Sequence, residues 1–170
     1  MRKLIISIDQ AVHPNNIIAA STRVVEMLGL QTGKAREKDF LTVKFGEILS
    51  NHNSIVYTWQ KQIFAGDFLT VFHPENRRYL MTFSEAVQLV LQAVVLGYSR
   101  EVFILDMGET VKILDLAQRF IQMSRYRVSQ DIKVILTDLY FGDKLYNKWL
   151  ILGEEDDKIV NGYFVYCTNN

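Results

Sequence analysis

The sequence has few of the residues that mark several classes of protein. It contains one cysteine, Cys167, in 170 residues. No disulfide can form within the chain, and this composition is typical of a reducing, cytoplasmic setting. Only two prolines occur, and no Pro- or Gly-rich linker or internal repeat interrupts the chain. We therefore expect a single domain over 1–170.

The chain also has no excess of positive or negative charge, and it has no long apolar run. Lys and Arg together number 19, and so do Asp and Glu, which leaves no basic stripe for nucleic acid or anionic lipid. The longest apolar stretch, 86–96, contains two glutamines and is too short to span a bilayer. Only three apolar residues follow the basic amino terminus, too few for a signal peptide. We expect a soluble, cytoplasmic protein.

What is present is the pattern of a globular α/β domain. Hydrophobic residues make up 49% of the chain and charged residues 22%, enough to build a core. Short β-branched runs predict strands at 4–7, 41–45, 69–72, 102–105, 132–136 and 163–167. Helical periodicity predicts helices from an Asn15 or Asn16 cap to Gly29, and over 54–65, 82–97, 112–123 and 142–152. Regular alternation of this kind indicates βαβ units, so the predicted class is α/β with a mainly parallel sheet.

The segment 82–97 carries the clearest helix signal. Thr82 and Glu85 have the spacing of a capping box, and Gly97 is a helix stop. Apolar residues then recur at helical spacing, and we expect this face to be buried: Val87, Val90, Leu91, Val94 and Val95.

No glycine-rich phosphate motif occurs, so the residues alone predict neither a dinucleotide site nor a P-loop. The three histidines (His13, His52 and His73) lack the spacing of metal ligands, and no metal site is expected. In parallel sheets, ligands bind at the carboxyl ends of the strands, which here are 7–10, 46–47, His73 and 106–109.

Two kinds of charged residue near these strand ends have alternative interpretations. Asp9 and Asp106 could each serve as an acid or a hydrogen-bond acceptor, but solvation or helix capping more often explains such positions. Arg77 and Arg78 could hold a diphosphate through bidentate hydrogen bonds, or could form a solvated pair in a loop.

Six segments together resemble one family. They are 7–16 (SIDQAVHPNN), 43–47 (VKFGE), 73–82 (HPENRRYLMT), 84–93 (SEAVQLVLQA), 104–109 (ILDMGE) and 142–146 (GDKLY). On these segments the chain resembles the carboxyl-terminal part of nucleotide-sugar 4,6-dehydratases. These are polysaccharide-biosynthesis enzymes of the extended short-chain dehydrogenase/reductase superfamily that act on UDP-N-acetylglucosamine. The resemblance implies a truncated Rossmann-like fold that carries the substrate side.

Two departures from the family's pattern bear on catalysis. The amino-terminal half of the family, with its glycine-rich turn for the cofactor pyrophosphate, has no counterpart here. The resemblance therefore implies no NAD(P) site unless a partner supplies that half. The family's Thr-Asp-Lys segment reads Ile8, Asp9 and Gln10, and its Tyr- or Met-x-x-x-Lys motif has Ile18 and Thr22 at the two defining positions. Only Asp9 is kept.

The resemblance also implies that fewer residues are available to bind the sugar nucleotide. Arg78 matches an arginine that contacts the diphosphate in the family, whereas Glu47 replaces an asparagine and would repel phosphate if it faced the site. The family's Arg-Pro-Gly segment has become Tyr-Phe-Gly at 140–142, which leaves Asp143 and Lys144 as further candidates for binding a UDP-sugar weakly.

Three hypotheses follow from this resemblance. The first is a non-catalytic accessory or interaction protein in surface-polysaccharide biosynthesis, a homo-oligomer or the partner of another chain. Association, or a rearrangement of the sheet, is expected because the strand at 4–7 would otherwise form an exposed sheet edge with apolar faces. The second is one subunit of a split dehydratase, with Asp9 as its acid and the NAD(P) site on another chain. The third is a UDP-sugar-binding module that uses Arg78.

Overall fold

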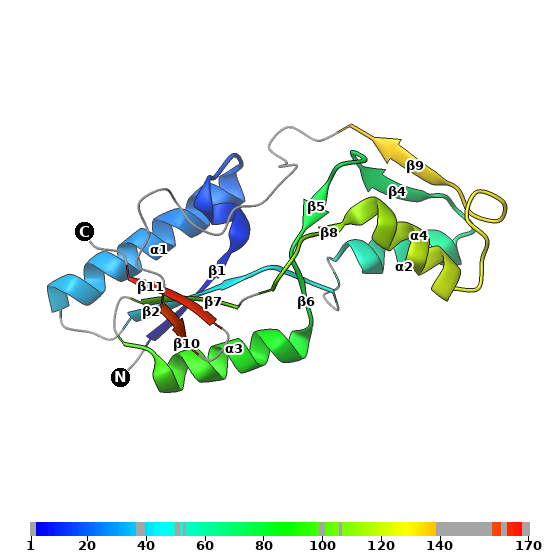
Figure 1. Ribbon diagram of the computed structural model, residues 1–170. Coiled ribbons are helices and arrows are strands. Elements are labelled where there is room, and N and C mark those ends of the chain that lie inside the picture. Colours follow the sequence, from blue (N-terminus) through cyan, green and yellow to red (C-terminus); the bar gives the residue numbers. More distant parts are fainter. Residues whose placement is uncertain are drawn as a thin grey trace. The chain divides into compact units, whose positions relative to one another are not determined.

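The computed structural model describes residues 3–36, 40–49, 52, 54–98, 101–105, 107–138, 158–160 and 163–167 (Figure 1). Contacts divide the chain into two compact units. Unit 1 comprises Met1–Gly46, Phe83–Gly108 and Lys148–Asn170, and unit 2 comprises Glu47–Thr82 and Glu109–Asn147. The expectation of a single domain over 1–170 stays a prediction.

Unit 1 contains a five-stranded sheet. In spatial order its strands are β1 (Lys3–Ile8), β2 (Phe40–Phe45), β7 (Glu101–Leu105), β11 (Tyr163–Cys167) and β10 (Lys158–Val160). The first three strands run parallel, and β11 and β10 join antiparallel. Leu41–Phe45 of β2 is buried on both faces, as the apolar run of a central parallel strand requires. The α/β class and the predicted strands of this unit are confirmed.

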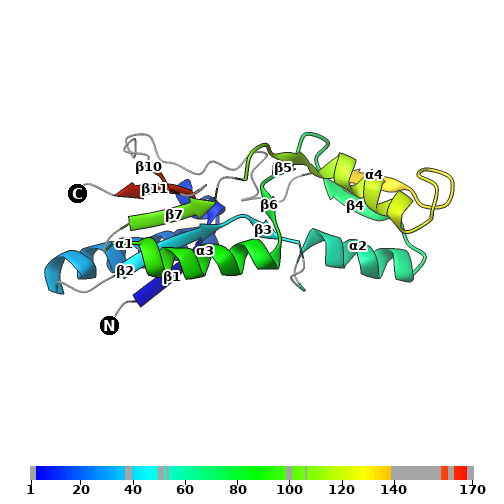
Figure 2. The same ribbon diagram turned by 60° about the horizontal axis from the view of Figure 1, so that its bottom comes forward.

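Two helices cover opposite faces of this sheet (Figures 1 and 2). The helix α1 (Ile17–Arg36) packs on β1 and β2, and α3 (Phe83–Leu96) packs on β2 and β7. Asn16 caps α1, since its Oδ1 accepts a hydrogen bond of 2.8 Å from the amide of Ala19. Among the described residues, no helix is both long and apolar enough to cross a membrane.

The predicted stop of α1 at Gly29 is wrong, because the helix continues to Arg36. Gly29 is buried where α1 crosses β1, and a Cβ atom there would overlap Cδ1 of Ile5. The glycine therefore permits a close approach between helix and strand and does not end the helix.

The predicted buried face of α3 is also wrong. The buried residues are Ala86, Leu89 and Ala93. Of the five residues predicted to be buried, Val90 is half-buried and four are exposed: Val87, Leu91, Val94 and Val95. The helix is apolar around most of its circumference, so periodicity alone does not define the side that meets the sheet. The two alanines determine which side of α3 faces the sheet, because their small side chains let the helix backbone approach the strands.

Gly97, directly after α3, lies close to side chains of the sheet strands β2 and β7. This close contact leads to a testable prediction. A Cβ atom at Gly97 would lie 2.5 Å from the carbonyl oxygen of Ala93 and 2.8 Å from side-chain atoms of Leu41 and Phe103. We expect Gly97→Ala to lower the free energy of unfolding by about 1–3 kcal/mol, the usual effect of overpacking. Urea denaturation measures this change.

The matched control is Gly29→Ala, where the added methyl group meets mainly the movable tip of Ile5. The gain in helix propensity, about 1 kcal/mol, partly offsets that contact. Equal losses of stability in the two variants would contradict this account of Gly97.

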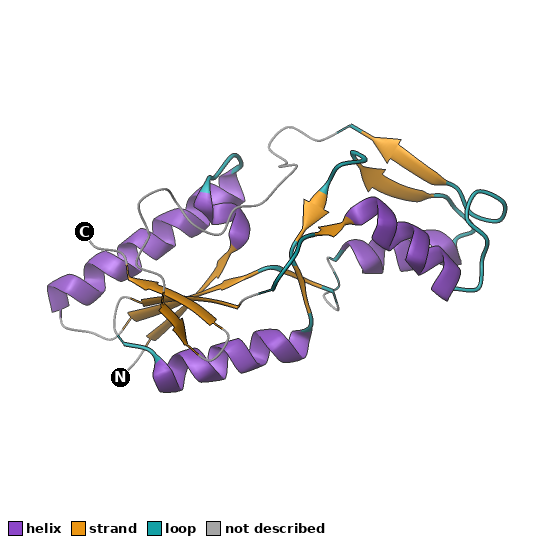
Figure 3. Cartoon of the chain, viewed as in Figure 1, coloured by secondary structure: helices purple, strands orange, loops and turns teal. Residues whose placement is uncertain are grey.

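In the part of unit 2 that the structure describes, there are three two-stranded sheets and two helices (Figure 3). The strands β4 (Leu69–Phe72) and β9 (Val134–Thr137) pair in parallel, as do β3 (Glu47–Ile48) and β6 (Leu80–Met81). The strands β5 (Arg77–Arg78) and β8 (Val111–Lys112) pair antiparallel. The helices α2 (Ile55–Phe64) and α4 (Ile113–Met123) both contact β4. The core between these two helices and β4 consists of Trp59, Leu69, Val71, Ile113, Ala117, Ile121 and Ile132.

The helix boundaries of unit 2 agree with the sequence predictions. Ser54 caps α2, accepting a hydrogen bond of 3.3 Å from the amide of Tyr57, and Gly66 follows its end with a φ of 75°. The strand expected at 132–136 is found at Val134–Thr137. The helix predicted at 142–152 lies outside the described residues.

Candidate functional site

The carboxyl end of β1 holds the one catalytic position that the resemblance keeps. Ile8 ends β1 with extended backbone, and Asp9 begins a short 3-10 helix, η1 (Asp9–Val12). The side chain of Asp9 is buried, and those of its two neighbours, Ile8 and Gln10, are half-buried. Asp9 therefore occupies the strand-end position where this class of fold binds ligands.

The first turns of α1 carry the other two catalytic positions. Ile18 is largely exposed, and the hydroxyl of Thr22 donates a hydrogen bond of 2.9 Å to the carbonyl oxygen of Ile18, one turn earlier. That bond holds the threonine hydroxyl against its own helix. These positions therefore present an apolar side chain and a backbone-bound hydroxyl.

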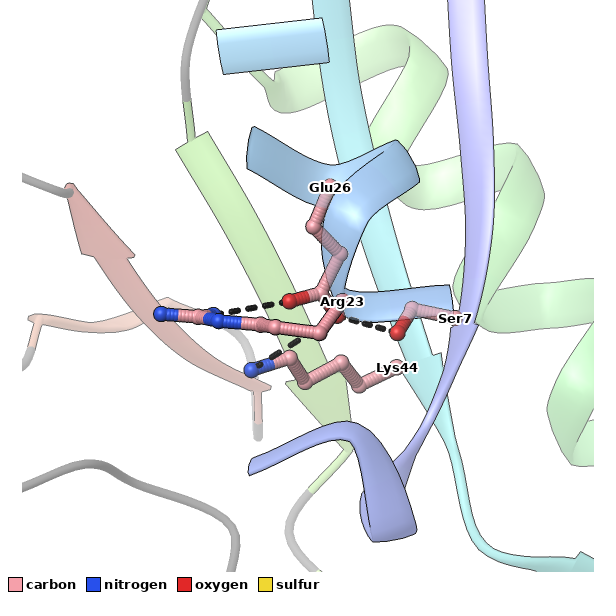
Figure 4. A network of polar contacts seen from close by, with 4 residues as sticks. All are labelled: Ser7, Arg23, Glu26 and Lys44. Carbon is pink, nitrogen blue, oxygen red and sulfur yellow. Dashed lines mark hydrogen bonds and ion pairs between the residues drawn. The ribbon is translucent and has the colours of Figure 1, made fainter. Parts of the chain in front are cut away.

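A buried polar network joins β1, α1 and β2 near this strand end (Figure 4). Glu26 of α1 is its centre. One carboxylate oxygen, Oε1, accepts a hydrogen bond from the hydroxyl of Ser7 and lies 3.8 Å from Nζ of Lys44. The other, Oε2, accepts a hydrogen bond of 2.8 Å from Nη1 of Arg23. Ser7, Glu26 and Lys44 are all buried.

The network compensates buried charge. An ammonium group in a protein interior is costly without a counter-ion, and the carboxylate of Glu26 offsets that cost for Lys44. The bond from Ser7 to Glu26 also joins β1 to α1 two residues before Asp9. Sequence reasoning missed the network. The available signal was Lys44, a charged residue inside the otherwise apolar run of β2.

In unit 2, two arginines form β5 and bond to backbone carbonyls. Arg77 Nη1 lies 3.4 Å from the carbonyl oxygen of Thr110, and Arg78 Nη1 lies 3.2 Å from that of Arg77. Both side chains are half-buried. A guanidinium has five N–H donors, so a carbonyl bond and a bidentate bond to a diphosphate are compatible.

A backbone hydrogen bond holds Glu47 next to the residue that follows β5. Its amide donates a hydrogen bond of 2.9 Å to the carbonyl oxygen of Tyr79, the residue after Arg78. Its carboxylate Oε1 accepts a hydrogen bond of 3.2 Å from the amide of Ile55, the first residue of α2. A carboxylate at a helix amino terminus is favoured by the helix dipole. In this structure the charge of Glu47 therefore caps α2.

The loop between β4 and β5 is also fixed by polar contacts. His73 has a φ of 55°, and its Nδ1 accepts a hydrogen bond of 3.1 Å from the amide of Glu75. The ammonium group of Lys112 donates a hydrogen bond of 2.8 Å to Glu75 and holds the pKa of that carboxyl below its ordinary value of 4.5. Because the folded-state pKa is lowered, this contribution to stability is present above the unfolded-state pKa. It is lost as the pH falls through the folded-state value.

Two buried polar atoms of unit 2 lack hydrogen-bond partners among the residues the structure describes. They are Oδ1 of Asn76, whose side chain is 3% exposed, and Oγ1 of Thr137 at the carboxyl end of β9. A buried acceptor without a donor is unfavourable unless a ligand or solvent supplies one. Asn76 lies two residues before Arg78.

The structure thus brings the predicted residues into two groups. Asp9, with its altered neighbours, belongs to unit 1, whereas Glu47, His73 and Arg78 belong to unit 2. The remaining candidates, Asp106, Asp143 and Lys144, lie outside the described residues. Within the described part of the chain, no group of three or more His, Cys, Asp or Glu residues could hold a metal ion.

Comparison with known proteins decides the family. The sequence profile described as "Polysaccharide biosynthesis protein" matches residues 2–167. The chain belongs to this polysaccharide biosynthesis protein family. The resemblance read from the sequence segments is therefore confirmed.

One relative and two solved structures show how much of this family's architecture the chain contains. The "Probable polysaccharide biosynthesis protein EpsC" of Bacillus subtilis is 41% identical over 147 residues, which cover 86% of this chain and 24% of that protein. The structure of Pen from Bacillus thuringiensis has a TM-score of 0.88 at 23% identity, covering 99% of this chain and 52% of that one.

A UDP-N-acetylglucosamine 4-epimerase from Methanobrevibacter ruminantium, solved in complex with UDP-N-acetylmuramic acid, has a TM-score of 0.71 at 14% identity. The match covers 89% of this chain and 55% of the epimerase. The fold of this chain is therefore the Rossmann-like fold of the nucleotide-sugar dehydratases and epimerases. The chain spans about a quarter of the curated relative and about half of the two solved chains.

Proposed function

We propose that this member of the polysaccharide biosynthesis family is a non-catalytic homologue of nucleotide-sugar 4,6-dehydratases. It would act as an accessory protein in the formation of a surface polysaccharide. The observation that carries this proposal is the set of side chains at the catalytic positions. Where the resemblance expects an acid, a base and a lysine, the chain has Asp9, Gln10 and Thr22.

These side chains do not fit a nicotinamide cofactor with its proton relay. An amide and an aliphatic hydroxyl are not general bases at neutral pH, and the hydroxyl of Thr22 is bonded to Ile18. No side chain at these positions offers an ammonium group to a cofactor ribose. Asp9 is the acid that is kept, while the base and the lysine that a dehydration at C5 and C6 of the sugar needs are replaced by Gln10 and Thr22.

A direct assay tests the absence of catalysis. We expect the purified chain to leave UDP-N-acetylglucosamine unconverted in the presence of NADP, as measured by chromatography of the sugar nucleotide. A complete dehydratase assayed in parallel serves as the positive control. Conversion by the chain alone that is lost in Asp9→Asn would overturn the proposal.

A second function, one subunit of a split dehydratase, is favoured by the position of β1. Among the described strands it lies at the edge of the sheet, and α3 exposes large apolar side chains such as Leu91 and Val95. In that function Asp9 remains the acid, and another chain supplies the cofactor half. Conversion of UDP-N-acetylglucosamine that requires both chains and NADP, and is lost in Asp9→Asn, would establish it in place of the accessory role.

The buried acceptor of Asn76 favours a further activity, the binding of a UDP-sugar by unit 2. The guanidinium of Arg78 would hold the diphosphate, and Asn76 Oδ1 would accept a hydrogen bond from the ligand. A UDP-sugar is bound in the related epimerase structure from Methanobrevibacter ruminantium. We expect weak binding, because Glu47 adds a negative charge near the amino terminus of α2.

Calorimetry with UDP-N-acetylglucosamine measures this binding. Loss of a charge-assisted bidentate contact weakens binding by roughly tenfold or more, so Arg78→Ala should abolish the heat of a weak complex. The control is Arg127→Ala, an exposed arginine of the same unit that pairs with Asp131 at 3.0 Å. No heat at millimolar ligand, or equal heats in the two variants, would contradict binding at Arg78.

A further inference from the structure

The carboxyl ends of α2 and α4 leave large apolar side chains in solvent. Phe64, the last residue of α2, is 95% exposed, and Met123, the last residue of α4, is 82% exposed. Phe68 and Tyr126 are exposed in the segments that follow these helices. We call these four residues the helix-end surface. Single exposed apolar residues are common on proteins, so the surface is informative only if the four lie together.

Contacts within unit 2 place the two helix ends side by side. The ring centroid of Phe120, in α4, lies 6.0 Å from that of Trp59, in α2. Met123 follows Phe120 by three residues and is therefore its neighbour on the surface of α4. The segments after the helices are also joined, because the amide of Leu69 donates a hydrogen bond of 2.9 Å to the carbonyl oxygen of Lys133. Figures 1 and 2 show the same arrangement of the two helix ends.

The core of unit 2 does not need these side chains. Buried residues such as Trp59 and Ile121 already fill the space between α2 and α4. An apolar side chain in water is unfavourable, and the last turn of a helix ordinarily carries polar or basic residues that can bond its carbonyl groups. The composition of the helix-end surface is therefore that of a contact site.

Basic side chains occur in the same two segments of the chain. Residues 61–68 and 119–133 together contain five basic and two acidic residues, whereas the whole chain has 19 of each. One pair is neutralised, since Arg127 bonds to Asp131. The other four basic side chains are exposed and form no ion pair with another described residue: Lys61, Arg119, Arg125 and Lys133. The charge balance of the whole chain, which predicted no basic stripe for anionic lipid, does not extend to this surface.

We propose that the helix-end surface binds the headgroup region of an anionic lipid bilayer. Phe64 and Met123 enter the boundary between headgroups and acyl chains, and the basic side chains contact lipid phosphates. Lysine and arginine suit this arrangement, because their aliphatic stems lie along apolar surface while their charges stay in water. The inference goes beyond the proposed function and does not depend on it.

The combination of apolar and basic side chains favours a bilayer over other partners. A nucleic acid or another soluble polyanion would meet the four cations, but it offers no apolar layer to Met123, whose thioether cannot stack on a base as an aromatic ring does. A second copy of the chain would offer apolar side chains, but two such surfaces in contact would bring like charges together. An anionic bilayer matches both the charge and the apolar side chains.

Sedimentation of the full chain with lipid vesicles tests the proposal. We expect binding to vesicles of phosphatidylcholine that contain about one third phosphatidylglycerol, and binding to phosphatidylcholine alone that is roughly tenfold weaker or less. Phe64→Ser and Met123→Ser should each weaken binding roughly tenfold, because an apolar side chain no longer leaves water. Arg125→Gln and Lys133→Gln should each weaken it about fivefold.

The matched controls lie in unit 1. Phe83→Ser changes a phenylalanine that is 64% exposed at the start of α3, and Lys3→Gln removes the charge of an exposed lysine. Both variants should bind the anionic vesicles as the parent chain does. All the substituted side chains are exposed, so every variant should keep the circular dichroism of the parent chain.

A reporter variant, Phe64→Trp, measures insertion directly. On anionic vesicles its fluorescence should shift to shorter wavelength, and lipids brominated in their acyl chains should quench it. The parent chain is the reference, since its Trp59 is fully buried and cannot meet the lipid. Quenching in the variant that does not exceed quenching in the parent chain contradicts insertion at this position.

The proposal is overturned if the chain does not bind the anionic vesicles, or if Phe83→Ser weakens binding as much as Phe64→Ser does. It is also overturned if heparin binds as tightly as the vesicles and Phe64→Ser changes neither affinity, because the surface then recognises charge alone. A dimer of the chain that Phe64→Ser dissociates would mean that a second copy covers the surface. None of these outcomes bears on the non-catalytic role, which the assay with UDP-N-acetylglucosamine tests separately.

Discussion

Replacing Glu26 with alanine is expected to lower the free energy of unfolding by about 3–5 kcal/mol, the usual result of removing one partner of a buried ion pair. The variant leaves the buried ammonium group of Lys44 without the carboxylate 3.8 Å away, and removes the acceptor of Ser7. Thermal or urea denaturation measures the loss. We expect this to be among the most damaging substitutions of a single polar residue in unit 1.

Two further variants test whether the buried ion pair causes the loss of stability expected for Glu26→Ala. The double substitution Glu26→Leu with Lys44→Met removes both charges and should recover much of the loss, since a buried pair can often be replaced by apolar side chains. Glu75→Ala removes an exposed carboxylate that pairs with Lys112 and should have a far smaller effect. If Glu75→Ala and Glu26→Ala destabilise the chain equally, burial of the network is not the cause.

The largest effect in unit 2 is expected for Trp59→Ala, a loss of about 3–5 kcal/mol. The side chain is fully buried at the centre of the core, and its ring centroid lies 6.0 Å from that of Phe120. Its Nε1 also donates a hydrogen bond of 2.8 Å to the carbonyl oxygen of Thr70, which joins α2 to β4. Alanine would leave both a cavity and an unsatisfied carbonyl group.

Trp59→Phe separates these two contributions, because it keeps most of the buried ring and removes the hydrogen bond. We expect its loss of stability to lie clearly between those of the wild type and Trp59→Ala. The control, Phe64→Ala, truncates a highly exposed ring on the same helix and should change stability by less than about 0.5 kcal/mol. A similar loss in Phe64→Ala would show that α2 itself, and not the core, is sensitive.

The local elements of the fold were predictable because their signals are local. The β-branched run of β4, the Ser54 cap of α2 and the glycine after it specify their structure within a few residues. The role of Gly29 was not predictable in the same way. A glycine that ends a helix and one that lets a strand approach look alike until the position of Ile5 is known.

The buried face of α3 could not be derived from periodicity, since apolar residues occupy most of the circumference of the helix. Its orientation depends on Ala86 and Ala93, whose small size matters only against the sheet. The resemblance supplied the candidate positions Asp9, Thr22 and Arg78. It did not supply the bond that holds Thr22 to its own helix, or the capping of α2 by Glu47. Both depend on which backbone group lies nearest in the folded chain.

The division of the chain into interleaved segments has a consequence for how the protein folds. The strands β2 and β7 pair in parallel, with Thr42 opposite Val102, yet the chain passes through the first segment of unit 2, Glu47–Thr82, between them. Pairing these strands closes a long loop, which costs chain entropy before any contact forms. Sheets assembled from such distant segments fold slowly. The early collapse of unit 2 would shorten that loop, so Trp59→Ala should slow the formation of the unit 1 sheet as well as weaken its own core.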